Sequence, residues 1–259
     1  HNDFQHFSCG VSLWSVRNCF EKNDFDALDA FLIYFQNTML QMRNSKLPVI
    51  AAPVGMSIGG GFEVVLHADH VVGHANSVMG LVESFMGVVP AGGGCKETLY
   101  RWSESLGDGR KGAWKSFMNI GLGRKANSPQ EADALSMRRA NDVFHMNRDR
   151  ILTGALSSIE TTSKAKTRNP LALSGVDHFE EMLEWLTTNH KNGMLTPHDV
   201  TVGTEIGRIM TGGNCASGTI FTEQDILDAE RSSFLTLAQT QETQARIVSM
   251  LDNGITLRN

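Results

Sequence analysis

The chain has 259 residues, a formal net charge of −5 at neutral pH and a pI near 6.0. With 41% hydrophobic and 20% charged residues, it can bury a core as one domain or two closely packed lobes. The acidic balance excludes a general nucleic-acid binder. The sequence shows no apolar run of about 18 residues, which a membrane span needs, and no secretory signal. We therefore expect a protein of the cytoplasm or an organelle matrix that is not secreted.

The chain contains four cysteines, Cys9, Cys19, Cys95 and Cys215. None of them is spaced as C-x-x-C, so the pattern indicates neither a zinc site nor a disulfide framework and is typical of a reducing compartment. His67 and His70 could suggest a pair of metal ligands, but two histidines on one helix supply no third ligand. We therefore expect no metal site.

Helices and strands are predicted to alternate in the first half of the chain. Apolar residues recur every three or four positions over residues 24–43, which predicts a long amphipathic helix. The apolar run 49–53 predicts a strand that is covered on both faces. Residues 62–68 are compatible with a helix, and residues 71–75 predict a second strand. This alternation continues to about Leu122 and is typical of an α/β fold.

The second half of the chain is predicted to be mostly helical from Ile151 onward. Ser128 is a predicted N-cap with Pro129 at the first helical position. Residues 162–175 are polar and contain helix breakers, which predicts a linker. Residues 222–225 resemble a capping box, with Asp in place of Glu, and open the last helical region.

A run of glycines and two glutamates stand out in the most apolar part of the sequence. Glycines 59–61 precede the predicted helix 62–68, so their N–H groups lie at a helix N-terminus, where unpaired donors and the helix dipole favour negative charge. Such donors, aimed at a carbonyl oxygen, form an oxyanion hole. Glu63 follows directly, and Glu83 lies in an apolar run with no cation nearby in sequence. Two close carboxyl groups in an apolar site have pKa values that are pushed apart, which suits acid–base chemistry.

Less specific explanations exist for each of these residues. A lone Glu63 in a first helical turn can serve only the helix dipole, and three glycines alone indicate no more than a turn. Residues 55–59 also match G-x-S-x-G, the nucleophile elbow, which would make Ser57 the nucleophile of a hydrolase. The following glycines would then occupy the first helical turns unfavourably, and no downstream histidine lies in a context that suggests a base. We therefore prefer the pair of glutamates.

This passage resembles the core of the crotonase superfamily, the enoyl-CoA hydratases and isomerases. The family's Pro-Val-Ile-Ala-Ala strand is similar to residues 48–52, and its Gly-Gly-Gly-x-Glu turn is similar to residues 59–63. Its second Glu, twenty residues further on, corresponds to Glu83. Its Pro-Gly-rich turn is similar to residues 90–94, with Ala91 in place of a first glycine.

Residues 7–13 resemble the Ala-Gly-Ala-Asp segment of the family, with Val11 and Ser12 in place of its second Ala and its Asp. The resemblance implies an oxyanion hole made of the N–H groups of Val11 and Gly60. A backbone donor survives a change of side chain, although Val11 narrows the pocket. The resemblance also implies contacts to the substrate from the residues around these positions: Cys9, Gly10, Gly59, Gly61, Pro90, Ala91 and Gly92.

The implied reaction is hydration of a 2-trans-enoyl-CoA to a 3-hydroxyacyl-CoA in fatty-acid β-oxidation. Glu63 would activate a water for attack at C3, and Glu83 would deliver a proton to C2. The coenzyme A thioester is the substrate, and no other cofactor is implied. The alternative within the fold is the shift of a 3-enoyl double bond to position 2, but an isomerase needs only one acid–base carboxylate. The alternative from another class is a non-catalytic assembly domain of a β-oxidation protein.

A locally basic stretch follows the site: Lys96, Arg101, Arg110, Lys111, Lys115, Arg124 and Lys125. Because the protein is acidic, it needs local cations to bind the anionic coenzyme A. Members of this stretch are candidates for that contact, although a solvated helix face is the default interpretation of such a run of charges.

The resemblance also predicts how the chain is organised. Strands that precede residues 7–13 in the family are absent from this sequence, so we expect a fragment of a longer protein. We expect residues 1–150 to form a crotonase-like ββα spiral core, truncated at its N-terminus, and residues 151–259 to form a helical region for oligomerisation and site cover. A homotrimer or hexamer follows by analogy. Residues 6–13 and 242–259 resemble the hydratase part of bifunctional proteins, where a 3-hydroxyacyl-CoA dehydrogenase precedes it.

Overall fold

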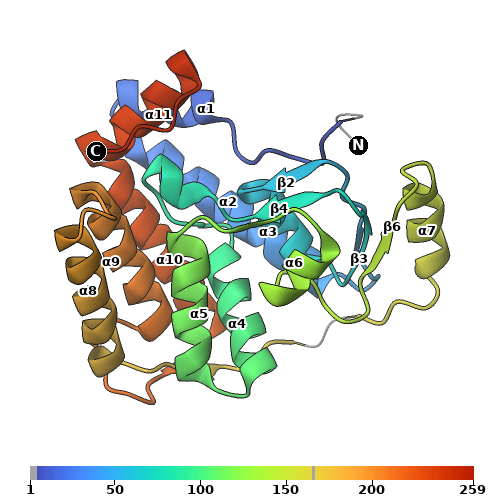
Figure 1. Cartoon of the computed structure of the whole chain (residues 1–259). Helices are drawn as coiled ribbons and strands as arrows, with labels where there is room; N and C mark the ends of the chain where they lie inside the picture. The colour runs from blue at the N-terminus through green and yellow to red at the C-terminus, as the bar shows by residue number, and fades with distance from the viewer. Residues whose placement is uncertain (1–4, 165–166) are drawn as a thin grey trace.

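The computed structural model describes residues 5–164 and 167–259, in which strands and helices alternate before the chain turns helical (Figure 1). Its helices are α1 (Leu13–Glu21), α2 (Phe25–Asn44), α3 (Gly60–His67), the 3-10 helix η1 (Glu83–Met86), α4 (Gly94–Leu106), α5 (Gly109–Gly121), α6 (Pro129–Ala134), α7 (Arg150–Ser158), α8 (Val176–Lys191), α9 (Pro197–Thr211), α10 (Glu223–Ala238) and α11 (Gln241–Asn253). Its strands are β1 (Ile50–Ala51), β2 (Met56–Ile58), β3 (His70–His74), β4 (Val78–Gly80), β5 (Lys125–Ala126), β6 (Val143–His145), β7 (Leu171–Ala172) and β8 (Ile220–Phe221).

The strands of the first half form two small sheets, and the chain passes from one to the other and back. One sheet has the order β1-β3-β6 and is parallel, while the other has the order β2-β4-β5, with β2 and β4 parallel and β5 antiparallel. The pair β1–β2 is followed by α3, and the pair β3–β4 is followed by η1. Successive turns of the chain therefore stack as a spiral, in which Ile50 pairs with His70 and Met56 pairs with Val78. This confirms the predicted α/β class with a ββα spiral.

Helix α3 lies at the centre of the core. Its residues Phe62, Val65 and Leu66 are each 1% exposed, and α2, α4 and β2 pack around it. The long helix predicted over residues 24–43 is α2. The Asp24 side chain caps it by accepting a hydrogen bond from the Ala27 N–H, and its apolar stripe is buried.

The strand predicted over residues 49–53 is wrong in length, because only Ile50–Ala51 pairs as a strand. Pro48 precedes this run and Pro53 ends it, and a proline has no N–H to donate to a ladder. Pro53 still contributes its carbonyl, which accepts a hydrogen bond from the His74 N–H at 2.9 Å.

The second half is helical, as predicted. In Figure 1, α8, α9 and α10 lie on the side of α4 and α5 that faces away from the sheets, and α11 returns to α1. The predicted linker 162–175 is wrong in one respect: the part that the structure describes contains β7, which pairs with β8. The alternation of Leu171 and Leu173 around an exposed Ala172 explains this, because Leu173 is buried and the ladder continues through its N–H to the Thr219 carbonyl.

Local capping signals correspond well to the helix starts. Ser128 caps α6 with Pro129 at the first position, and Thr222 and Asp225 form the predicted capping box of α10. A second box, Thr196 with Asp199, starts α9 and was not predicted from the sequence. None of the helices in the described ranges is long and apolar enough to cross a membrane.

Candidate active site

Glu63 lies in the first turn of α3, at the buried N-terminal end of that helix. The N-cap, Gly59, has a φ of 56°, a left-handed conformation that favours glycine. Glu63 is 2% exposed, and its Oε1 accepts hydrogen bonds from the N–H groups of Gly92 and Gly94, both at 2.8 Å. A Cβ on either of these glycines would lie 2.8 Å from a carboxylate oxygen of Glu63. The glycine-rich turn therefore binds this carboxylate through its backbone N–H groups.

Glu83 begins η1 and brings its carboxyl group to the same place. A Cβ on Gly59 would lie 3.3 Å from Glu83 Oε1, so the carboxyl group packs on the start of α3. Both carboxyl oxygens of Glu83 are buried and have no hydrogen-bond partner among residues 5–164 and 167–259. A buried carboxyl group without donors is costly to ionise.

The electrostatics of the two glutamates differ in a way that suits proton transfer. Burial raises the pKa of Glu63 to about 7, while the two backbone donors and Lys96 act to lower it. Burial also raises the pKa of Glu83 well above its usual range, and the neighbouring Glu63 raises it further. Because Glu63 has donors for its anion, it is the one that ionises first, and Glu83 keeps the proton.

A cavity of about 380 Å³ joins the two carboxyl groups to most of the site that the sequence predicts. The predicted residues that line it are Cys9, Gly10, Val11, Gly59, Gly60, Glu63, Glu83, Ala91 and Gly92. Gly61 and Pro90 are buried and are not among its lining residues. A Cβ on Gly61 would lie 2.5 Å from the Ser8 carbonyl oxygen, so Gly61 allows the close approach of two backbone segments.

The two backbone segments that contain Gly60 and Val11 lie next to each other at this cavity. Gly60 is the first residue of α3, and the first N–H groups of a helix have no partner within the helix. Gly10 has a φ of 96°, and a Cβ there would lie only 3.2 Å from the Gly60 nitrogen. Val11 Cγ2 packs 3.3 Å from the position of a Gly60 Cβ. The Ser8 hydroxyl holds this turn by accepting a hydrogen bond from the Gly10 N–H at 3.1 Å.

Much of the remaining wall of the cavity is apolar and comes from helices at both ends of the chain. Helices α1, α2, α10 and α11 contribute Leu13, Val16, Phe31, Leu32, Phe35, Phe234, Ile247 and Met250. A largely apolar cavity with two carboxyl groups on one wall fits a ligand that has a small reactive group and an apolar tail.

Two cations of the basic stretch, Lys96 and Arg101, are buried, while the other five are exposed, as a solvated face predicts. Lys96 is fully buried, with Glu97 and Glu223 as its partners, and Arg101 donates to the carbonyls of Leu66 and Met137. These cations belong to the interior because they neutralise buried acids or satisfy backbone carbonyls. The exposed Lys125 does line the cavity.

Glu230 is a functional neighbour of the site that sequence reasoning missed. Its two oxygens accept hydrogen bonds from the N–H groups of Gly93 and Lys96, both at 2.7 Å, so it shares the N-terminus of α4 with Glu63. Burial and the charge of Glu63 raise the pKa of Glu230 well above its usual range. The sequence could have indicated its burial, because Glu230 lies in the buried stripe of α10 between Leu227 and Leu237, but that pattern does not identify its partners.

Ser57 does not have the geometry of a nucleophile elbow. It lies inside strand β2, opposite Met79 of β4, and is fully buried. An elbow instead exposes its serine on a sharp turn between strand and helix. The turn in this protein comes two residues later, at Gly59.

The comparisons with known sequences agree with this geometry. Residues 6–106 match the family model described as Enoyl-CoA hydratase/isomerase. The chain is 30% identical over 262 residues to a protein of Bacillus subtilis (strain 168) named Probable 3-hydroxyacyl-CoA dehydrogenase, covering 100% of this chain and 33% of that protein. It is 24% identical over 248 residues to a Putative fatty acid oxidation complex trifunctional enzyme of Rickettsia prowazekii (strain Madrid E), covering 95% of this chain and 32% of that protein. The chain thus spans about a third of the length of these two relatives.

The comparisons with solved structures concern the fold. An enoyl-CoA hydratase from Rhodobacter sphaeroides 2.4.1 superimposes with a TM-score of 0.66 at 14% identity, covering 98% of this chain and 76% of the other. An enoyl-CoA hydratase from Bacillus halodurans gives a TM-score of 0.61 at 15% identity, covering 96% and 78%. Residues 6–106 are thus similar to the enoyl-CoA hydratase/isomerase family, and the chain as a whole has the fold of these two enoyl-CoA hydratases.

Proposed function

We propose that the protein hydrates 2-trans-enoyl-CoA thioesters to 3-hydroxyacyl-CoA in fatty-acid β-oxidation. The observation that carries this proposal is the pair Glu63 and Glu83, two buried carboxyl groups with raised pKa values in one cavity. Hydration adds a hydroxyl group at one carbon and a proton at the next, so it is served by one base and one acid. An isomerase would need only one of them.

The hydrogen bonds suggest which glutamate has which role. Both backbone donors bind Oε1 of Glu63 and stabilise its anion, so this carboxylate is the base that takes a proton from water as the water attacks C3. Glu83 has no donors in the described part of the chain and keeps its proton, which it delivers to C2. The thioester carbonyl would lie against the N–H groups of Gly60 and Val11, where the charge that develops on its oxygen is stabilised.

The proposal extends to a larger protein. The relatives named as a dehydrogenase and as a trifunctional enzyme are about three times as long as this chain, and a 3-hydroxyacyl-CoA is the substrate that the first name implies. We propose that an upstream dehydrogenase part is covalently linked and that the protein forms a homotrimer or hexamer. The mass of the native product and sedimentation of the purified protein test these two points, and a short native monomer would contradict both.

The test of hydration is the loss of ultraviolet absorbance of a conjugated short-chain enoyl-CoA. We expect Glu63→Gln and Glu83→Gln each to lower kcat by about 10²–10⁴-fold, with circular dichroism unchanged. Ser57→Ala is the matched control inside the neighbouring strand and is expected to keep its rate. Thioester cleavage that disappears in Ser57→Ala would support a hydrolase instead. Inactivity of the folded parent protein would favour a non-catalytic assembly domain.

A further inference from the structure

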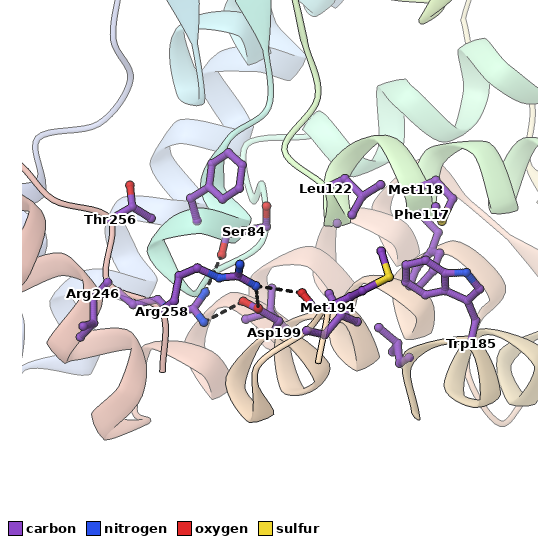
Figure 2. A pocket seen from close by; sticks show the side chains of 17 residues that line it. Ser84, Phe117, Met118, Leu122, Trp185, Met194, Asp199, Arg246, Thr256 and Arg258 are labelled. Atoms are coloured by element: carbon purple, nitrogen blue, oxygen red, sulfur yellow. Dashed lines mark hydrogen bonds and ion pairs between the residues drawn. The ribbon is translucent and has the colours of Figure 1, made fainter. Parts of the chain in front are cut away.

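A second cavity, of about 370 Å³, lies on the other side of η1 (Figure 2). Helices α5 and α8 and the turn before α9 give it an apolar wall: Phe117, Met118, Leu122, Trp185, Met194 and Leu195. In the view of Figure 2, Thr256 and Trp185 lie at opposite ends and Ser84 lies between them. Much of the lining comes from residues 185–203 in the helical second half of the chain.

The charged groups of the second cavity are already paired. Arg246 is 2% exposed and donates to Asp199, to Thr196 Oγ1, to the Ser84 carbonyl and to Asn259. Arg258 donates to Asp199 and to the Met194 carbonyl. The cavity therefore offers hydrocarbon, rather than a free charge, to a ligand.

The two cavities are adjacent and share two lining residues. Phe85 and Thr256 line both of them. The 3-10 helix η1 lies between the two cavities, because its residue Glu83 lines the first, the next residue, Ser84, lines the second, and Phe85, which follows, lines both. The Phe85 ring rests on the backbone at Gly123, where a Cβ would lie 2.5 Å from Cε2. A tail that starts beside Glu83 would therefore have to displace or pass the Phe85 ring to reach the second cavity.

We propose that the second cavity receives the distal methylene groups of a long acyl chain, with Phe85 at the entrance, and that the protein therefore prefers long-chain enoyl thioesters. This inference rests on the proposed function, since it needs the thioester end in the first cavity. Each additional buried methylene strengthens binding by about fourfold. The rise in kcat/KM with chain length therefore continues until both cavities are filled.

Gly121 allows the second cavity to be blocked without a clash. It lines only the second cavity, and the nearest heavy atom to a Cβ built there is Ile206 Cδ1, at 4.0 Å. A leucine at this position therefore occupies cavity space. Gly109, at the other end of the same helix, is a matched control, because it is exposed and its Cβ would meet only the Ala172 carbonyl, at 3.7 Å.

The experiment measures kcat/KM for four-, eight-, twelve- and sixteen-carbon 2-enoyl-CoAs. We expect the ratio of kcat/KM for the sixteen-carbon substrate to kcat/KM for the four-carbon substrate to fall by about tenfold or more in Gly121→Leu, because two or more methylene groups can no longer bind in the second cavity. The ratio should stay at the wild-type value in Gly109→Leu and shift less in Gly121→Ala than in Gly121→Leu. An unchanged ratio in Gly121→Leu, or a wild-type rate that does not rise beyond eight carbons, would overturn the inference. Absence of hydration of the four-carbon substrate would instead contradict the proposed function.

Discussion

The pKa values of buried carboxyl groups are shifted upward near one end of helix α3 and downward near the other. At the N-terminal end of α3, Glu63 and Glu83 have pKa values that are raised by burial. Beyond its C-terminal end, Glu97 of α4 is equally buried, yet its pKa lies well below its usual range. Burial by itself therefore does not decide what a buried carboxyl group does.

The difference lies in the cations that reach each acid. Lys96, Arg43 and Arg168 have nitrogens 2.9–3.4 Å from the carboxylate oxygens of Glu97. Glu63 has only backbone donors as hydrogen-bond partners, and Glu83 has none in the described ranges. A charge that is neutralised by neighbours is a structural anion, whereas an acid held in hydrocarbon can exchange a proton near neutral pH.

The largest loss of folding stability is expected from Glu97→Gln. Three cations would lose their common anion, and breaking a buried ion pair from one side costs about 3–5 kcal/mol. Unfolding by urea should report this loss of stability. Glu104→Gln is the matched control, because Glu104 also pairs with Arg168 but is 63% exposed, so its loss should cost less than about 1 kcal/mol. Equal effects of the two variants would contradict the assigned role of Glu97.

Glu83→Gln should change stability in the opposite direction. The pKa of Glu83 in the folded protein lies above its ordinary value of 4.5, so the folded state loses stability relative to the unfolded state as the pH rises above about 4.5 and through the folded pKa. Glutamine cannot ionise, and the variant escapes this loss. We expect it to be more stable than the wild type by about 1–3 kcal/mol at pH 8.5 and to show little difference at pH 4, with thermal unfolding as the measurement. A variant that is less stable at pH 8.5 would show that Glu83 is paired.

The pH dependence of kcat/KM sharpens the assignment of the base. Glu63 must be ionised to accept a proton, and its pKa is about 7. The rate should therefore fall about tenfold per pH unit below pH 7 and fall again at higher pH as Glu83 loses its proton. A profile that stays flat from pH 5 to pH 8 would rule out Glu63 as the base.

The smallest effect is expected at Lys125, the exposed cation on the wall of the first cavity. If it attracts the phosphates of coenzyme A, Lys125→Ala should raise KM by about two- to fivefold with kcat unchanged, because an exposed charge contributes less than about 1 kcal/mol. Lys111 is a matched control, since it is exposed and pairs with Asp108. A similar rise of KM in Lys111→Ala would indicate a general charge effect instead.

Much of the site was predictable because its signals are local. The left-handed Gly59, the free helix start at Gly60 and the carboxylate of Glu63 all lie within five residues, and Glu83 has no cation near it in sequence. The role of Glu230 was not predictable, since its partners Gly93 and Lys96 are more than 130 positions away in sequence. The burial of Lys96 was not predictable for the same reason, because its partner Glu223 comes from another helix.

The sequence by itself determined the helices with clear periods and caps, such as α2 and α10, and the order of glycines and acids at the start of α3. These features depend on hydrogen bonds and side-chain spacing within a few residues. Only the tertiary structure decided which buried acids are neutralised by cations and which are not. It also decided that two adjacent cavities share Phe85 of η1, because their walls are built by segments that are far apart in the sequence.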